Sequence, residues 1–394
     1  MSVGVKEWDV IVVGLGAHGA ATALQLRRRG LSVLGLDMHH PPHDLGSTHG
    51  ETRITRLAIG EGEDYVPLAM RSHELWRQIE AESGTRVMVQ CGGLVLGNPA
   101  GALHGKADFV GRTIAAAERF GIRHEVLEAR DVRARFPGFQ ATDGEMAYYE
   151  PEAGLLSPEA GVAAQLRLAG AQGAELRLGE RVLGIEPTAD RVTVVTDLGR
   201  HAAARVVVAA GAWAPGLLGG GYRARLNLRR QTLHWFAAED PAAYGADRCP
   251  VFIWVHGADP ADNFYGFPIS PLGPGLDVKV AHEQIDTFVD RPEDVARTVT
   301  PEESRRVFER HIAGRLAGLG RTPTRTTTCI YTSATDARFI IEPHPDSDRV
   351  TVVSACSGHG FKHSPAIGEA VAAWIATGDR PAVLAPFSSW GTGS

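Results

Sequence analysis

The chain has 394 residues, a formal net charge of −6 and a hydrophobic content of 44%, which indicates a globular protein able to bury a large core. The mild acidic balance gives no electrostatic indication of nucleic acid or of an anionic membrane as a partner. The four cysteines are scattered without a Cys-x-x-Cys pair, so they indicate free thiols in a reducing compartment. No apolar stretch approaches the ~20 residues of a membrane helix. The first predicted strand leaves no room for a signal peptide, so we expect a cytoplasmic protein.

The first motif is a glycine-rich turn between a strand and a helix. Residues 10–13 form an apolar run typical of a buried strand, and an alanine-rich helix is predicted over 20–29. Between them stand Gly14, Gly16 and Gly19 in G-x-G-x-x-G spacing. The first glycine allows the tight turn, the second lets the backbone approach a pyrophosphate, and the third lets the helix pack on the strand. The helix N-terminus then favours the anionic ligand.

A second predicted strand, residues 32–36, ends at Asp37. An acid at this point, roughly 20 residues after the glycines, accepts the 2′-hydroxyl of an unphosphorylated ribose. Strand, turn, helix, strand and acid in this order predict a dinucleotide site. No second glycine fingerprint is visible in the sequence, which indicates one tightly held dinucleotide and a substrate delivered directly to it.

The remaining elements predict an α/β chain in which two domains are interleaved. The apolar run 205–211, which ends at Gly211, predicts a buried parallel strand. Helices are predicted over 64–82, 158–171 and 366–377, and strands over 175–178, 181–185, 191–196, 263–268, 277–281, 326–332 and 349–354. We therefore expect a discontinuous, Rossmann-like dinucleotide-binding domain and an α+β substrate domain. Their expected segments are 1–84, 151–215 and 329–394 for the first, and 85–150 and 216–328 for the second.

Several blocks of the sequence occur together in one order over nearly the whole chain. They cover residues 37–56, 60–68, 263–268, 329–331, 336–342 and 357–362. In these blocks the chain resembles the monomeric sarcosine oxidase and N-methyltryptophan oxidase family of flavoproteins. The resemblance implies an FAD domain like that of p-hydroxybenzoate hydroxylase, combined with a substrate domain of sheet and helix.

The resemblance also implies which residues contact FAD. Cys329, in a Cys-x-Tyr setting, corresponds to the family's cysteine that bonds covalently to the flavin 8α-methyl group; a lone strand cysteine would otherwise be a small buried hydrophobe. His49 and Arg53 correspond to residues beside the flavin ring, where a guanidinium keeps its charge at any relevant pH. The full set expected to bind FAD is Gly14, Gly16, Gly19, Asp37, Ser47, His49, Arg53, Gly211, Cys329, Gly358, His359, Gly360, Phe361 and Lys362.

A second set corresponds to the family's substrate and oxygen residues. Arg56 and Lys362 match the pair that binds the substrate carboxylate, which two cations orient through charge-assisted hydrogen bonds. Lys279 matches the lysine that activates oxygen, where a buried ammonium stabilises the superoxide anion. Outside this context each of these cations would most often be solvated. Tyr265, Tyr331 and His282 complete the expected substrate site, although His282 lies near the family's histidine rather than at its position.

Two departures from the family pattern bear on the expected site. Thr48 stands where the best-known members have a second histidine, so the flavin edge is expected to be hydrogen-bonded differently. The stretch 269–277 looks longer than usual, which bears on substrate choice and on the alignment of Lys279.

Other catalytic classes are disfavoured. Four histidines at 39, 40, 43 and 49 share one loop, but the Pro41-Pro42 pair and the family match argue against a metal, and we predict none. Ser357 and His359 lack the G-x-S-x-G elbow of a hydrolase.

The function implied by the resemblance is oxidation of secondary, N-methyl amino acids, as in sarcosine or N-methyltryptophan. The amine becomes an imine that is hydrolysed, and O2 becomes H2O2, with FAD carrying the redox chemistry. We expect a monomer that acts on a small amino acid and O2. The alternatives are an oxidase of a cyclic imino acid, such as pipecolate or proline, or of a natural-product amine; a dehydrogenase with another electron acceptor; and a non-catalytic FAD-binding subunit. The presence of Arg56, Lys279 and Lys362 together argues against the last.

Overall fold

The computed structural model describes residues 7–388 and contains two large sheets. The first sheet has eight strands, and its central pairs, β1–β2, β1–β14, β2–β11 and β14–β22, are parallel. In spatial order the strands are β11 (Glu175–Leu178), β2 (Val33–Asp37), β1 (Glu7–Val13), β14 (Arg200–Val208), β13 (Val192–Thr196) and β12 (Val182–Pro187), with β22 (Ser347–Ser354) beside β14 and β21 (Ile340–His344) beside β22. This is the predicted arrangement of buried parallel strands at the start, the middle and the end of the chain.

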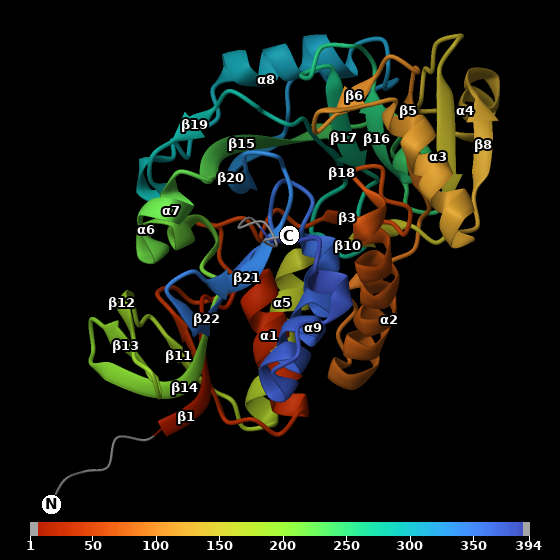
Figure 1. Ribbon diagram of the computed structural model, residues 1–394. Coiled ribbons are helices and arrows are strands. Elements are labelled where there is room, and N and C mark those ends of the chain that lie inside the picture. The colour runs from red at the N-terminus through yellow and green to blue at the C-terminus, as the bar shows by residue number, and fades with distance from the viewer. Residues whose placement is uncertain (1–6, 389–394) are drawn as a thin grey trace, which may run out of the picture.

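Helices cover one side of the first sheet, and the antiparallel β12–β13 pair, which extends this sheet from β14, lies away from them (Figure 1). The helices are α1 (Ala17–Arg28), α2 (Val66–Ser83), α5 (Pro158–Ala171) and α9 (Ser364–Thr377), and α1 packs against both α5 and α9. Helix α1 begins three residues earlier than the sequence predicts, so Gly19 lies in its first turn. Short helices α6 (Ala214–Leu218) and α7 (Gly220–Arg223) follow β14.

The second sheet has nine strands and lies above the helices in Figure 1. Its order is β19 (Phe288–Val289), β15 (Leu226–Ala237), β18 (Asp277–Ala281), β17 (Asn263–Phe267), β16 (Val251–Val255), β5 (Gly93–Gly97), β9 (Met146–Glu150) and β8 (Glu125–Glu128), and β20 (Arg325–Ala334) pairs with β15. Helices α3 (Phe109–Phe120), α4 (Ala129–Arg135) and α8 (Pro301–Val307) accompany it. The domain boundary predicted at residue 329 falls inside β20, which belongs to the second sheet; the division into domains itself stays a prediction.

Two small sheets lie near the junction of the large ones. One contains β3 (Arg53–Thr55), β10 (Gly154–Leu156) and β4 (Met88–Val89), and the other is the hairpin of β6 (Ala102–Leu103) and β7 (Lys106–Ala107). Within residues 7–388, no helix combines the length and apolar character needed to cross a membrane.

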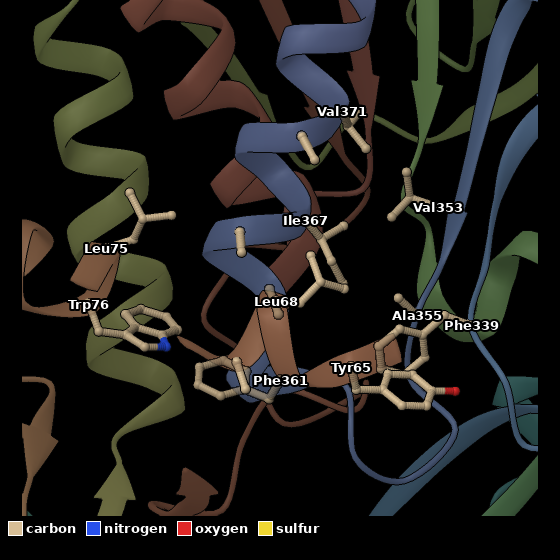
Figure 2. Close-up of a cluster of buried hydrophobic side chains, with 14 of the residues drawn as sticks. Tyr65, Leu68, Leu75, Trp76, Phe339, Val353, Ala355, Phe361, Ile367 and Val371 are labelled. Carbon is tan, nitrogen blue, oxygen red and sulfur yellow. The ribbon is translucent and has the colours of Figure 1, made fainter. Parts of the chain in front are cut away.

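A buried core connects α2 and α9 to the turn at residues 357–362 (Figure 2). Trp76 on α2 stacks on Phe361 with ring centroids 5.5 Å apart, and its Nε1 donates to the carbonyl of Lys362 at 3.3 Å. Ile367 and Val371 on α9 belong to the same cluster. This packing fixes the turn against the helical layer, and it therefore fixes Lys362 relative to the carboxyl ends of the parallel strands.

Candidate functional site

A cavity of about 980 Å³ extends from the carboxyl ends of the parallel strands to the second sheet. Open α/β sheets bind ligands at this edge. The predicted site residues in its lining are Gly14, Gly16, Asp37, Ser47, Arg53, Arg56, Gly211, Tyr265, Tyr331, Gly358, His359, Gly360, Phe361 and Lys362. The structure places the others, Gly19, His49, Lys279, His282 and Cys329, outside this lining.

The glycine turn has the geometry of a phosphate cradle. Gly14 has a φ of +86°, and a Cβ there would lie 2.6 Å from the carbonyl oxygen of Ala209. A Cβ on Gly19 would lie 1.7 Å from the carbonyl oxygen of Gly14, so this glycine permits the close approach of helix and turn. At Gly16, by contrast, a Cβ would meet only Thr48 Oγ1, at 3.7 Å. The space beside Gly16 is thus open cavity, which fits the approach of a pyrophosphate.

Asp37 holds the two sides of this cradle together. Its Oδ2 accepts from the backbone N–H of Leu15 at 2.7 Å, and its Oδ1 accepts from that of His39 at 2.8 Å. Because each carboxylate oxygen has a further lone pair, Asp37 can still accept a ribose hydroxyl from the cavity side. The residues present therefore fit a dinucleotide whose ribose carries no 2′-phosphate, such as FAD.

The turn at 357–362 brings a cation to the opposite wall. Gly360 is required there, because a Cβ would lie 1.5 Å from the carbonyl oxygen of Ala355. Lys362 is buried, and its Nζ donates to the carbonyl of His359 at 2.7 Å. Burial lowers the pKa of Lys362 to about 7, although the carboxylate of Glu61 acts in the opposite direction.

The loop before β3 lies against two predicted cations, Arg53 at the start of β3 and Lys279 on β18. Arg53 donates to the carbonyls of Ser47, at 2.7 Å, and Thr52, at 2.8 Å. Lys279 Nζ donates to the carbonyls of Gly50 at 2.7 Å and Thr52 at 2.9 Å and to Thr52 Oγ1 at 3.2 Å. Burial, with Arg53 nearby, lowers the pKa of Lys279, but three oxygen acceptors match the three donors of an ammonium. Lys279 is therefore a buried cation directly behind this loop.

His49 lies in the same loop and is 4% exposed. Burial, together with the positive charges of Arg53 and Lys279, lowers its pKa to about 3. The imidazole of His49 is therefore neutral near pH 7. It can donate or accept a hydrogen bond beside a cofactor, but it adds no charge there.

Cys329 on β20 lies close behind the cavity wall. Its Sγ is 3.6 Å from the carbonyl oxygen of Ser47 and 3.9 Å from a guanidinium nitrogen of Arg53. Gly46 and Ser47, which cover the sulfur, both line the cavity. Burial raises the pKa of the Cys329 thiol, while the positive charge of Arg53 acts in the opposite direction.

Two tyrosines from strands of the second sheet that are not adjacent to each other meet in the lining. The hydroxyls of Tyr265 on β17 and Tyr331 on β20 are 2.9 Å apart. Burial raises the pKa of Tyr265 to about 12, so both phenols remain protonated and polar near neutral pH. Together they contribute two phenol rings to the cavity lining, with their hydroxyls in contact.

Arg56 is held by two buried carboxylates, one directly and one through the backbone. It donates to Glu61 Oε2 at 2.6 Å and to the carbonyl of Ala58. Burial opposes the ionisation of Glu61, but the Arg56 guanidinium holds the pKa of Glu61 well below its usual range. Glu150 accepts from the N–H groups of Leu57, at 2.8 Å, and Ala58, at 3.2 Å, and so fixes the segment after Arg56. A substrate carboxylate would therefore compete with Glu61 for this guanidinium.

The position of His282 differs from the expectation. Its ring stacks on His311, with centroids 4.7 Å apart, on the sheet face away from the cavity. Glu283, the next residue, lines the cavity instead. Both residues follow the end of β18 at Ala281, and adjacent side chains in an extended segment point to opposite sides, so Glu283 and His282 face different surroundings. That alternation is present in the sequence and is the signal that could have pointed to Glu283, which was not among the predicted site residues.

His104, on the β6–β7 hairpin, also lines the cavity, and no sequence signal pointed to it. Its Nε2 is 2.9 Å from Glu283 Oε2, and its Nδ1 is 3.7 Å from Glu61 Oε1. The charges therefore alternate along the wall from Arg56 through Glu61 and His104 to Glu283. No group of three or more potential metal ligands is found among residues 7–388.

Comparisons with known proteins agree with this geometry. The sequence pattern of the family described as "DAO: FAD dependent oxidoreductase" matches residues 9–374. The monomeric sarcosine oxidase of Streptomyces avermitilis is 38% identical over 373 residues, which cover 94% of each chain. The N-methyl-L-tryptophan oxidase of Yersinia pestis is 33% identical over 386 residues, which cover 97% of this chain and 98% of that protein.

Solved structures give the same result for the fold. NikD, an unusual amino acid oxidase essential for nikkomycin biosynthesis, superposes with a TM-score of 0.82 at 28% identity, covering 96% of this chain and 95% of NikD. Glycine oxidase from Geobacillus kaustophilus superposes with a TM-score of 0.74 at 21% identity, covering 97% of this chain and 98% of that chain, a likeness that concerns the fold alone.

Proposed function

The chain belongs to the DAO family of FAD-dependent oxidoreductases, and from this premise we propose that it is an oxidase of secondary, N-methyl amino acids with O2 as the electron acceptor. The family and its FAD-binding α/β fold, both predicted from the sequence, are confirmed by the match over residues 9–374. The observation that carries the substrate proposal is the pair of buried cations, Arg56 and Lys362, in the lining of one cavity.

FAD, when bound, supplies the chemistry that takes a hydride from the substrate and passes electrons onward. The chain's own residues bind and orient it. The open space at Gly16 and the free lone pairs of Asp37 support binding of the pyrophosphate and ribose there. Arg53, held by two carbonyls of its own loop, is a fixed charge beside the expected place of the ring.

Arg56 and Lys362 orient the substrate through its carboxylate. The Arg56 guanidinium together with the protonated form of Lys362 defines both the position and the direction of a carboxylate, so the amine is presented in one geometry. The amine must be neutral to give up hydride, and the phenols of Tyr265 and Tyr331 on this wall are themselves uncharged near neutral pH. The product H2O2, a monomeric state and a cytoplasmic location belong to the same proposal.

A peroxide-coupled screen of purified yellow protein tests this function. N-methyl amino acids should produce H2O2 in proportion to the amine consumed, and they should bleach the flavin without oxygen. Bleaching without peroxide would instead identify a dehydrogenase with another acceptor. Turnover of pipecolate or proline in place of N-methyl amino acids would identify an oxidase of cyclic imino acids.

Arg56→Ala should weaken substrate binding and leave the flavin spectrum largely unchanged. Losing one charge-assisted hydrogen bond costs about 1.5–3 kcal/mol, which corresponds to a roughly 10- to 150-fold rise in the substrate dissociation constant. The measurement is a titration of flavin absorbance with a substrate-like acid that does not react. Arg112→Ala is the matched control, because Arg112 donates to the carbonyl of Gly60 nearby but does not line the large cavity. Equal turnover of the substrate and its carboxamide by the unaltered enzyme would contradict the assignment, since neither cation would then recognise a carboxylate.

Cys329 is proposed as the site of covalent flavin attachment, on the strength of the resemblance and of its place behind Ser47 and Arg53. Flavin should stay with the polypeptide after acid precipitation of the unaltered protein, and Cys329→Ser should release it. Cys356→Ser is the control, because Cys356 also lines the cavity but has no such place in the resemblance. If acid frees all the flavin from the unaltered protein, the attachment is not covalent.

A further inference from the structure

One carboxylate in the cavity has no part in the steps described so far. Glu283 is 8% exposed and lines the cavity, while its neighbour His282 packs against His311 on the other face. Burying a carboxylate is costly unless it is paired. A partner within the protein must therefore compensate for the burial of Glu283, and its position in a substrate cavity calls for a functional explanation.

The structural partner uses one oxygen of Glu283 and leaves the other nearly free. His104 Nε2 lies 2.9 Å from Oε2, whereas the nearest cation to Oε1 is a guanidinium nitrogen of Arg229 at 3.8 Å, beyond hydrogen-bond distance. Burial acts in the opposite direction, but the charge of His104 lowers the pKa of Glu283. The carboxylate is therefore ionised, and Oε1 can accept a further hydrogen bond.

The Glu283–His104 pair lies on the wall that holds the expected substrate. A Cβ on Gly358 would be 3.5 Å from His104 Nε2 and 3.0 Å from the ring of Tyr331. His104 also lies against His359, with ring centroids 5.4 Å apart. His359 and Gly358 belong to the turn that carries Lys362, so His104 is the side chain that lies between Glu283 and this turn.

We propose that Glu283 recognises a hydrogen-bond donor, an N–H or O–H group, on the side chain of the amino acid substrate, with His104 holding the carboxylate in place. The inference rests on the proposed function, in which Arg56 and Lys362 hold the α-carboxylate and leave the side chain to the rest of this wall. A carboxylate is an acceptor only, so it favours donors and penalises a purely aliphatic side chain that leaves it unpaired. An acidic side chain is disfavoured, because Glu61 and Glu283 both lie in the same lining.

Matched substrates of equal shape test this specificity. N-methyl-L-homoserine is compared with N-methyl-L-norvaline, and α-N-methyl-L-ornithine with N-methyl-L-norleucine, by kcat/KM and by anaerobic flavin bleaching. The unaltered enzyme should prefer the donor-bearing member of at least one pair by about 10- to 100-fold. Glu283→Gln, which keeps the shape and removes the charge, should reduce that ratio by about fivefold or more.

The control variant is Glu145→Gln. Glu145 is a buried carboxylate that accepts from Trp254 Nε1 at 2.7 Å and does not line the cavity, so the ratio should stay unchanged in this variant.

Four outcomes would overturn the inference. Equal kcat/KM values for both members of each pair with the unaltered enzyme would overturn it, whether or not Glu283→Gln folds. A higher kcat/KM for the aliphatic members would also overturn it. If the preference for the donor-bearing substrates persists in Glu283→Gln, other residues are responsible for that preference. Faster reaction of N-methyl-L-glutamate than of every donor-bearing substrate would show that His104 and Arg229 recognise an anion instead. If no N-methyl amino acid bleaches the flavin, the proposed function itself is wrong, which separates that failure from a failure of this inference.

Discussion

Lys279→Met should slow the reaction of the reduced enzyme with oxygen by about 100- to 1000-fold, a loss typical for one preorganised group that stabilises developing charge. The ammonium has an anion to stabilise only while electrons pass to O2. An interaction made in one transition state lowers that barrier and leaves the other step alone, so reduction by the amine should change far less. Stopped-flow absorbance gives both rates, as bleaching by substrate without oxygen and as recolouring after oxygen is added.

The structure defines the control for this experiment. Methionine keeps the length of the side chain but leaves the carbonyls of Gly50 and Thr52 without their donor, at a cost in stability of about 1–3 kcal/mol for each buried group. Thermal unfolding of the variant therefore has to be measured alongside the kinetics. Lys106→Met, at an exposed position of the β6–β7 hairpin, removes a lysine charge without these contacts. If bleaching collapses in Lys279→Met while recolouring is unaffected, Lys279 acts on the substrate instead.

The dinucleotide half of the site could be predicted from the sequence because its signals are local. β1, α1 and β2 follow one another within residues 7–37, and the glycine spacing, the apolar runs and Asp37 all refer to this one unit. The start of α1 was placed three residues late, because a glycine in a first helical turn resembles the end of the preceding turn in sequence. In the structure, the 1.7 Å approach at Gly19 shows that the glycine belongs to the helix and is needed for its packing.

The polar wall of the substrate half could not be predicted in the same way. Arg56 and Glu61 stand in an irregular segment without periodicity, so nothing in the sequence pairs them. His104 lies on the β6–β7 hairpin, and Glu283 follows β18. The two residues are 179 positions apart in the sequence, and only the tertiary fold brings His104 Nε2 within 2.9 Å of Glu283 Oε2. Strand alternation from Lys279 would have selected Glu283 over His282 for the cavity lining, whereas the resemblance to a family histidine drew attention to His282.

Glycine-to-alanine changes at positions 16 and 19 should both reduce the flavin content of the purified protein, but through different physical causes. At Gly19 the added methyl group would meet the Gly14 carbonyl oxygen at 1.7 Å, so helix and turn must separate. Overpacking of this kind costs about 1–3 kcal/mol or more, and the flavin-free protein should therefore unfold at lower urea concentration. At Gly16 the methyl group meets only Thr48 Oγ1 at 3.7 Å, and the flavin-free protein should keep its stability.

The loss in Gly16→Ala should instead appear only in binding. The methyl group occupies space that a pyrophosphate needs, and a steric cost of about 1–3 kcal/mol corresponds to a flavin affinity lower by roughly 5- to 150-fold. Flavin absorbance per mole of protein and urea unfolding of the flavin-free form separate the two causes. Gly170→Ala is the control, since a Cβ at this exposed helical position has no neighbour within 4 Å. If Gly16→Ala binds flavin like the unaltered protein, the pyrophosphate does not pass beside Gly16, and the cradle must lie elsewhere along the edge of the parallel strands.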